Sequence, residues 1–85
     1  MPEWSYQLER AAVEALMAVT DAEAARLLVA FETLGWQPGA PADFVSVDER
    51  GRPLLYRRVG DLAIVYWRSQ VRRRVVIVEI ERMED

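Results

Sequence analysis

Two arginines and two tyrosines in the second half of the chain could act on a phosphate group. Arg57 and Arg58 are adjacent, and guanidinium groups hold phosphate oxygens in bidentate contacts. Tyr56 and Tyr66 carry phenol groups that could serve as a general acid or base. A structural interpretation is also open, with the arginines on a solvated or salt-bridged sheet face. A tyrosine that faces a core likewise packs its ring and satisfies one hydrogen bond.

A second basic group consists of three consecutive arginines, Arg72, Arg73 and Arg74. Together with Arg68 this group could track a phosphate backbone, or it could be an ordinary charged hairpin loop. Trp67 precedes the group, and an exposed tryptophan favours a partner interface or base stacking. The alternative for Trp67 is packing against the loop that holds Trp36.

The composition excludes several kinds of active site. The 85 residues include no histidine and no cysteine, which removes the commonest metal ligand, the commonest general base and all thiolate chemistry. A zinc enzyme and a Ser-His-Asp hydrolase are therefore excluded, and we expect neither a metal nor a cofactor.

The charge is unevenly distributed along the chain, whose net value is -3. Residues 1–49 carry two arginines against nine acidic residues, and residues 50–85 carry nine arginines against five. The acidic total argues against binding to nucleic acid by charge alone. No apolar run approaches a membrane span, and the first residues lack the pattern of a secretion signal. We therefore expect a single cytoplasmic domain with no membrane contact.

Apolar residues at helical spacing predict two helices near the start of the chain. The first runs from Arg10 to Val19. The second is capped by Thr20 or Asp21 and runs to about Leu34, and Gly35 is a natural stop. The short connection predicts an antiparallel helical hairpin.

Alternating apolar and polar residues predict five strands around these helices. One precedes the helices, from about Trp4 to Leu8. Another begins at Phe44, and the remaining three span about residues 53–59, 61–68 and 73–80. The order β-α-α-β-β-β-β indicates an α+β domain with the helix pair on one face of a mostly antiparallel sheet.

The turn at Gly60-Asp61 fixes which residues share a face of the sheet. In this hairpin Arg58 lies opposite Ala63, on the face away from the helices, called here the open face. The other members expected on the open face are Tyr56, Val65 and Trp67. The helix face takes Leu55, Arg57, Val59, Leu62, Ile64 and Tyr66. On the last strand the more apolar set is expected to face the helices, namely Arg74, Val76, Val78, Ile80 and Arg82. Glu79 then joins the open face near Arg58.

This element order, with an Arg-Val-Gly-Asp turn between two strands, resembles the RelE/ParE toxin superfamily. Family members often read Arg-Val-Gly-Asp-Tyr-Arg-apolar-apolar-Tyr, and residues 58–66 here read Arg-Val-Gly-Asp-Leu-Ala-Ile-Val-Tyr. The resemblance extends by topology over about residues 4–82. It is specific only in residues 58–66 and in the strand at residues 75–80.

The resemblance implies a toxin-like component of a type II toxin-antitoxin module. RelE-like members cut messenger RNA on the ribosome, with the RNA's own 2′-hydroxyl as the nucleophile and without a metal. ParE-like members bind DNA gyrase and do no known chemistry. Both kinds are normally neutralised by an antitoxin encoded alongside, so we expect a cognate antitoxin as a partner.

For a ribonuclease, the resemblance implies roles for particular residues. Arg58 and Arg82 would stabilise the phosphoryl transition state, and Tyr56 or Tyr66 would transfer a proton. The arginines expected to grip RNA are Arg57, Arg68, Arg72, Arg73 and Arg74. Trp67 is expected to contact a protein partner.

The alternative is a non-catalytic protein-interaction domain, either gyrase-directed or homodimeric. Ala63 stands where the family pattern has an arginine, and the loss of that arginine suits binding and does not suit cleavage. Exposed sheet edges in so small a chain favour association into a dimer. A third possibility is a domain that shares only the topology, because a fold does not imply a function.

Overall fold

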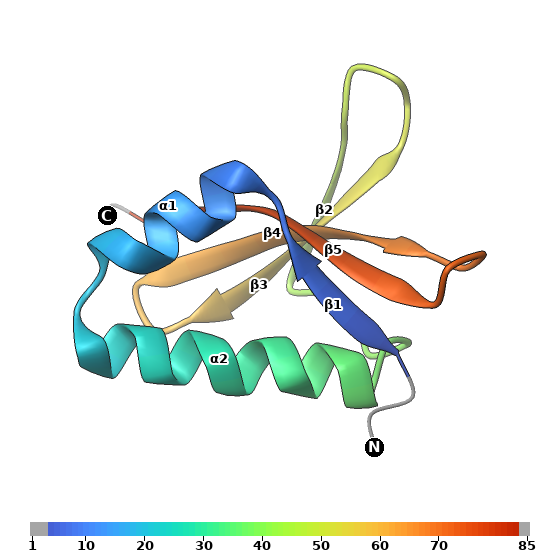
Figure 1. Cartoon of the computed structure of the whole chain (residues 1–85). Helices are drawn as coiled ribbons and strands as arrows, with labels where there is room; N and C mark the ends of the chain where they lie inside the picture. The colour runs from blue at the N-terminus through green and yellow to red at the C-terminus, as the bar shows by residue number, and fades with distance from the viewer. Residues whose placement is uncertain (1–3, 84–85) are drawn as a thin grey trace.

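The computed structural model describes residues 4–83, which form two helices and one five-stranded sheet (Figure 1). The elements in chain order are β1 (Ser5–Leu8), α1 (Arg10–Ala18), α2 (Asp21–Trp36), β2 (Phe44–Val47), β3 (Pro53–Val59), β4 (Leu62–Ser69) and β5 (Arg74–Arg82). The strand order is β1-β5-β4-β3-β2, and only the β1–β5 pair is parallel. The α+β class and the element order expected from the sequence are confirmed.

Helix α2 begins at a capping box built by two side chains. The backbone N–H of Glu23 donates to the hydroxyl of Thr20 at 3.1 Å, and the backbone N–H of Thr20 donates to the Glu23 carboxylate at 3.1 Å. Gly35 does not end the helix as expected, because it lies buried in the last turn. Its carbonyl accepts a hydrogen bond from the backbone N–H of Trp4 at 3.0 Å, and this tertiary contact holds the turn against the entry to β1.

Replacing Thr20 with alanine is expected to lower the free energy of unfolding by about 1 kcal/mol, because an N-terminal N–H of α2 loses its acceptor. Urea denaturation would measure the change. Thr33→Ala is the matched control, since the Thr33 hydroxyl only donates to the Val29 carbonyl within the same helix. An equal loss in both variants would show that the cap contributes nothing of its own.

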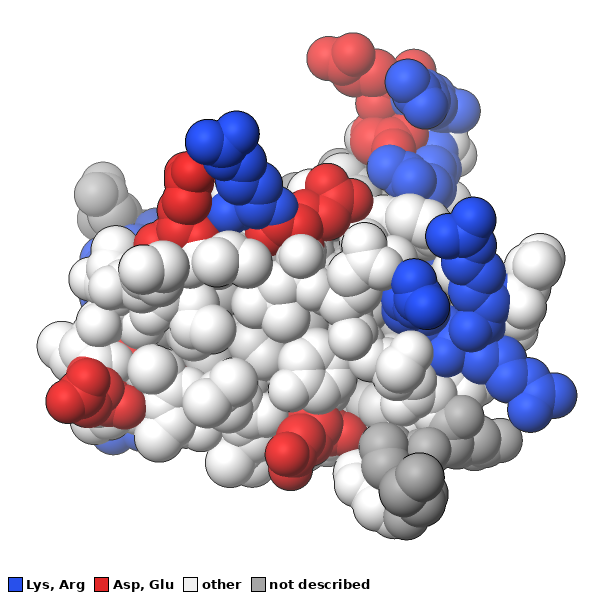
Figure 2. Space-filling model, viewed as in Figure 1, with Lys and Arg blue, Asp and Glu red and all other residues white. Residues whose placement is uncertain are grey.

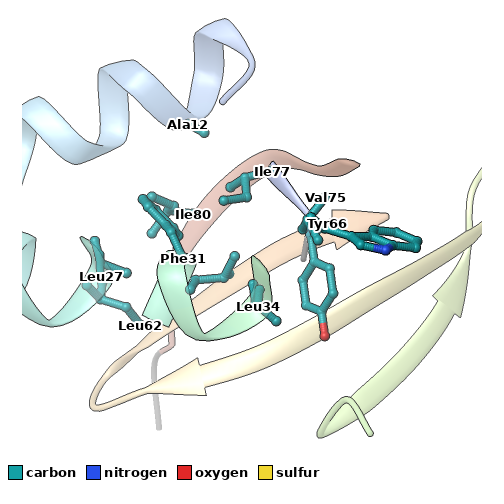
Figure 3. Close-up of a cluster of buried hydrophobic side chains, with 11 residues drawn as sticks. Ala12, Leu27, Phe31, Leu34, Leu62, Tyr66, Val75, Ile77 and Ile80 are labelled. Carbon is teal, nitrogen blue, oxygen red and sulfur yellow. The ribbon is translucent and has the colours of Figure 1, made fainter. Parts of the chain in front are cut away.

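Both helices cover the same face of the sheet and enclose one core (Figures 1 and 3). Helix α1 runs back across β5, and α2 returns in roughly the opposite direction below it (Figure 1). The largest fully buried side chains come from α2, β4 and β5, and they are Tyr66, Phe31, Leu27, Leu34, Ile64, Ile77 and Val75. One layer of helices thus leaves the opposite face of the sheet uncovered by any helix.

A β-bulge in β5 changes the faces expected for that strand. Glu79 pairs with Val65 and Ile77 pairs with Tyr66, so Val78 is an extra residue between two adjacent pairs. Val75 and Ile77 therefore face the helices as part of the core, and so does Ile80. The expectation that Arg74, Val76 and Ile80 share one face is wrong, because the bulge reverses the alternation at Val78. Glu79 lies on the open face, as expected.

Candidate functional site

Two cross-strand rows occupy the part of the open face nearest the Gly60-Asp61 turn. One row runs from Arg58 on β3 through Ala63 on β4 to Glu81 on β5. Arg58 is exposed, and its backbone N–H donates to the Asp43 carboxylate at 2.8 Å. Ala63 is 4% exposed at the centre of the row. The row therefore has a cation at one end, a carboxylate at the other and a methyl group between them.

The second row runs parallel to the first, from Tyr56 through Val65 to Glu79. The ring of Tyr56 packs edge-on against Phe44 of β2, with 5.2 Å between the ring centroids. Tyr56 and Arg58 are thus the two proposed catalytic residues that share the open face. Each is matched across the sheet by a carboxylate two strands away, which would repel a phosphate placed between the rows.

The other two proposed catalytic residues lie on the helix side of the sheet. Tyr66 is 0% exposed and belongs to the core cluster (Figure 3). Arg82 pairs in register with Leu62, which is also a core residue. The sheet therefore separates Tyr66 and Arg82 from Tyr56 and Arg58, and the four residues are not brought together.

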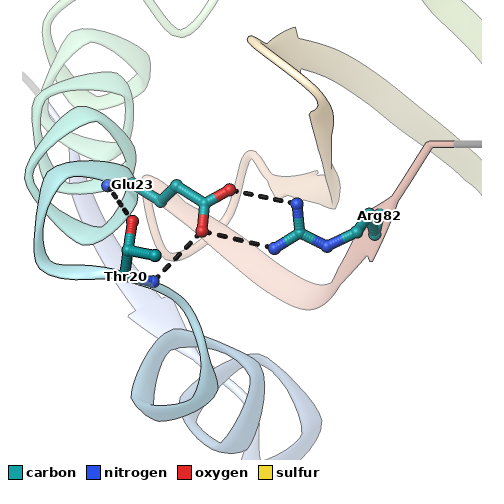
Figure 4. Close-up of polar contacts among 3 residues, drawn as sticks. All are labelled: Thr20, Glu23 and Arg82. Carbon is teal, nitrogen blue, oxygen red and sulfur yellow. Dashed lines mark hydrogen bonds and ion pairs between the residues drawn. The ribbon is translucent and has the colours of Figure 1, made fainter.

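Arg82 is engaged by a carboxylate of α2 (Figure 4). Its two terminal nitrogens donate to the two oxygens of Glu23 at 3.1 and 3.3 Å. This bidentate contact with Arg82, together with the Thr20 backbone N–H, lowers the pKa of Glu23 to about 2. The same contact raises the pKa of Arg82. Arg82 therefore joins the C-terminal end of β5 to the first turn of α2.

The Glu23 carboxylate predicts a loss of stability in acid. Its pKa in the folded protein, about 2, lies below the ordinary value of 4.5, so its contribution is fully present above about pH 4.5. We expect that contribution to disappear as the pH falls through 2. Urea denaturation between pH 2 and pH 6 would measure the loss, and Glu23→Gln should have a flatter profile over that range. Identical profiles for the two proteins would contradict the assignment.

The arginines near the β4–β5 turn are divided between the two faces of the sheet. Arg68 donates to the Ala40 carbonyl at 2.7 Å and lines a hollow on the helix side together with Arg73. Arg72 and Arg74 line a depression on the open face. Figure 2 shows basic side chains gathered at this end of the molecule, to the right of the view. The four arginines therefore do not form one continuous row on a single face of the sheet.

Arg57 lies on the helix face, as its place in the alternation predicts. It pairs with Ile64, and its side chain is half-buried. One of its terminal nitrogens is buried without a hydrogen-bond partner among residues 4–83. Arg57 is therefore remote from Arg72 and Arg74 and from the open face where Arg58 lies.

The ring of Trp67 is covered by Arg52, which the sequence analysis did not single out. The guanidinium carbon of Arg52 lies 4.3 Å from the centroid of the Trp67 ring, and Asp48 holds the Arg52 Nε at 3.0 Å. Trp67 does not pack against the loop at Trp36 as the alternative expected, since Trp36 ends α2 on the other side of the sheet. Arg52 lies just before β3, four residues before Tyr56, and strand alternation continued back from Tyr56 would place it on the same face as Trp67.

Within residues 4–83, no three histidine, cysteine, aspartate or glutamate side chains gather closely enough to ligate a metal ion. Over the same residues, neither helix is both long and apolar enough to cross a bilayer.

Comparison with known proteins finds similarity at the level of structure. No protein-family model matches the chain, and no curated protein sequence matches it. The archaeal RelE–RelB complex from Pyrococcus horikoshii OT3 contains a chain that superimposes with a TM-score of 0.78 and 19% identity, over 94% of both chains. The RelBE2 toxin–antitoxin complex from Mycobacterium tuberculosis contains another, with a TM-score of 0.75 and 19% identity, over 96% of this chain and 99% of that one. The resemblance inferred from the sequence is thus confirmed for the fold: this chain has the RelE-like toxin fold.

Proposed function

We propose that this chain is the toxin-like component of a toxin-antitoxin module and that it acts by binding, without cleaving RNA. The observation that carries the proposal is the row from Arg58 through Ala63 to Glu81. Cleavage by phosphoryl transfer needs cations around a transition state that gathers negative charge. The centre of this row offers a methyl group, and its far end offers a carboxylate.

Ala63 stands where the family pattern has an arginine, and the loss of that cation is expected to lower the rate of RNA cleavage strongly. Removing one group that stabilises such a transition state commonly costs about 3 kcal/mol, which is more than a hundredfold in rate. Arg82 is paired with Glu23 on the opposite side of the sheet, and Tyr66 is buried there. Arg58 and Tyr56 would therefore have to perform the reaction with two carboxylates, Glu79 and Glu81, two strands away on the same face.

Exposed apolar side chains support binding to a protein partner. Val13 and Met17 of α1 and Leu28, Val29 and Trp36 of α2 are between 41% and 81% exposed. The view of the helix side in Figure 2 has a broad uncharged area between its charged margins. Strand β2 adds Phe44, Val45 and Val47 at a free edge of the sheet. Surfaces of this kind are typical of protein–protein contacts.

A cognate antitoxin is the partner we propose. The two structures compared above are complexes of a toxin with its antitoxin. Co-expression of the chain with the product of the adjacent reading frame, followed by size-exclusion chromatography, should give a stable complex. Two separately eluting proteins would contradict this part of the proposal.

The absence of cleavage has its own test. The purified chain should leave messenger RNA intact on programmed ribosomes, and growth inhibition by the induced chain should be the same for Arg58→Ala as for the wild type. Arg10→Ala is the control substitution, because the exposed Arg10 side chain lies on the outer side of α1 and its one ion pair among residues 4–83 is with Glu14. Cleavage that is lost on replacement of Arg58 and Arg82 would overturn the binding proposal and support a ribonuclease.

A further inference from the structure

A second feature of the open face lies away from the two acidic rows, beside the β4–β5 turn. It is a depression with a volume of about 350 Å³, lined by side chains of β1, β4 and β5 and of the turn. Val76 is 5% exposed and pairs with Gln7 on one side and Trp67 on the other. Val76 therefore forms an apolar floor between a polar wall and an aromatic wall.

The aromatic wall is held in a fixed position. Trp67 lines the depression, while Arg52 lies against its ring and is itself held by Asp48. The ring nitrogen of Trp67 is buried without a hydrogen-bond partner among residues 4–83. Arg52 occupies one face of the ring, so a ligand in the depression would stack on the other face. A fixed indole is a suitable platform for a flat aromatic ligand, and every nucleobase has such a face.

Two arginines at the same depression have no acidic partner among residues 4–83. Arg74 donates to the neutral side chain of Gln7 at 2.7 Å. Arg72 is exposed, and its backbone N–H donates to the Ser69 hydroxyl at 3.3 Å. Glu9 is the one acidic residue in the lining. The depression is thus locally positive on a chain whose net charge is -3, and guanidinium pairs of this kind bind phosphate.

The surrounding charges limit the length of the ligand. The row that contains Glu79 crosses β4 at Val65, two residues or about 7 Å along the strand from Trp67, and the row that contains Glu81 crosses at Ala63, about 14 Å from Trp67. The screening length at physiological salt is about 8 Å, so the Glu81 carboxylate is largely screened from the depression, whereas the Glu79 carboxylate lowers the positive potential at its near end. Both carboxylates would repel a polynucleotide that continued along the open face toward them. Arg74 pairs with Ser69, about 14 Å along β4 from the Glu79 row, so the phosphate of a single nucleotide would lie away from that repulsion.

We propose that this depression binds a free nucleoside phosphate. The base stacks on Trp67 over Val76, and the phosphate lies on Arg72 and Arg74. The proposal is independent of the toxin function, because it requires neither an antitoxin nor an RNA target.

The test is a titration of the full chain with adenosine 5′-monophosphate, followed by calorimetry and by backbone amide chemical shifts. We expect saturable binding, with the largest shifts at Gln7, Trp67 and Val76. Trp67→Leu should weaken binding about tenfold, in line with the loss of one stacked base. Arg72→Gln and Arg74→Gln should each weaken it about fivefold, and adenosine without its phosphate should bind correspondingly less well.

Arg73→Gln is the matched control, because Arg73 is in the same turn but lines the hollow on the helix side. It should change the affinity less than twofold. Trp67→Phe keeps an aromatic face and should bind better than Trp67→Leu, which separates stacking from a loss of fold. An equal effect of Arg72→Gln and Arg73→Gln would overturn the proposal in favour of general charge attraction. No saturable binding would also overturn it, and so would a hexaadenylate RNA that binds more than tenfold tighter than the mononucleotide.

Discussion

Replacing Phe31 with alanine is expected to lower the free energy of unfolding by about 3–5 kcal/mol. Phe31 is 0% exposed at the centre of the helix layer, and its ring lies 5.5 Å from that of Tyr6 on β1. The substitution removes buried apolar surface and leaves a cavity where α2, β1 and β5 meet. For a domain of this size the melting temperature should fall by roughly 12–40 °C.

Thermal unfolding followed by circular dichroism would measure the effect. Leu28→Ala, three residues earlier on the same helix, is the control, because Leu28 is 44% exposed and should cost less than about 1 kcal/mol. Similar losses of stability in Phe31→Ala and Leu28→Ala would mean that the face of α2 that carries Phe31 is not the buried one.

Tyr66 should tolerate phenylalanine and not alanine. Its ring is fully buried, so Tyr66→Ala is expected to cost about 3–5 kcal/mol, as for other large core side chains. Its hydroxyl is buried without a hydrogen-bond partner among residues 4–83, and a buried unpaired hydroxyl is itself unfavourable. Tyr66→Phe should therefore raise the free energy of unfolding by about 1 kcal/mol.

Urea denaturation of both variants would separate the contribution of the Tyr66 ring to stability from that of its hydroxyl. A loss of stability in Tyr66→Phe would mean that the hydroxyl makes a favourable contact in the folded protein. The opposite signs expected for the two variants distinguish a structural tyrosine from one retained for its phenol group.

Much of the fold could be predicted from the sequence, because local signals at the β3–β4 turn and at the start of α2 agree with the tertiary structure. Gly60 has a φ of +61°, and the tight turn it permits fixes the β3–β4 register that pairs Arg58 with Ala63. Alternation then places Tyr56 and Arg57 on the correct faces. Thr20 and Glu23 have the spacing of a capping box, and α2 begins where that spacing indicates.

The faces of β5 could not be predicted, because a bulge leaves no mark in an apolar run. Residues 75–78 read Val-Val-Ile-Val, so moving the register by one residue changes nothing in the hydrophobic pattern. Only the pairing with β4 reveals that Val78 is the extra residue. The prediction therefore placed Arg74 and Val76 on the helix face, whereas both lie on the open face.

The site was harder to predict than the fold, since it depends on side chains that meet from distant parts of the chain. Arg73 has a φ of +49°, an unusual conformation for a residue other than glycine, and the turn that contains it sends neighbouring arginines to opposite faces. No spacing rule separates Arg72 from Arg73. The engagement of Arg82 by Glu23 also joins residues far apart in the chain.

The parallel pairing of β1 with β5 has a consequence for how the chain reaches its folded state. Ser5 pairs with Arg74 and Leu8 with Ile77, so β1 has its partner only once β5 is available. Such a contact closes a long loop, which slows folding and cannot form early during synthesis. A nascent chain still held by the ribosome up to β4 would leave Tyr6 and Phe31 without the strand that covers them. The protein therefore completes its core, and any surface that depends on it, only after β5 has left the ribosome.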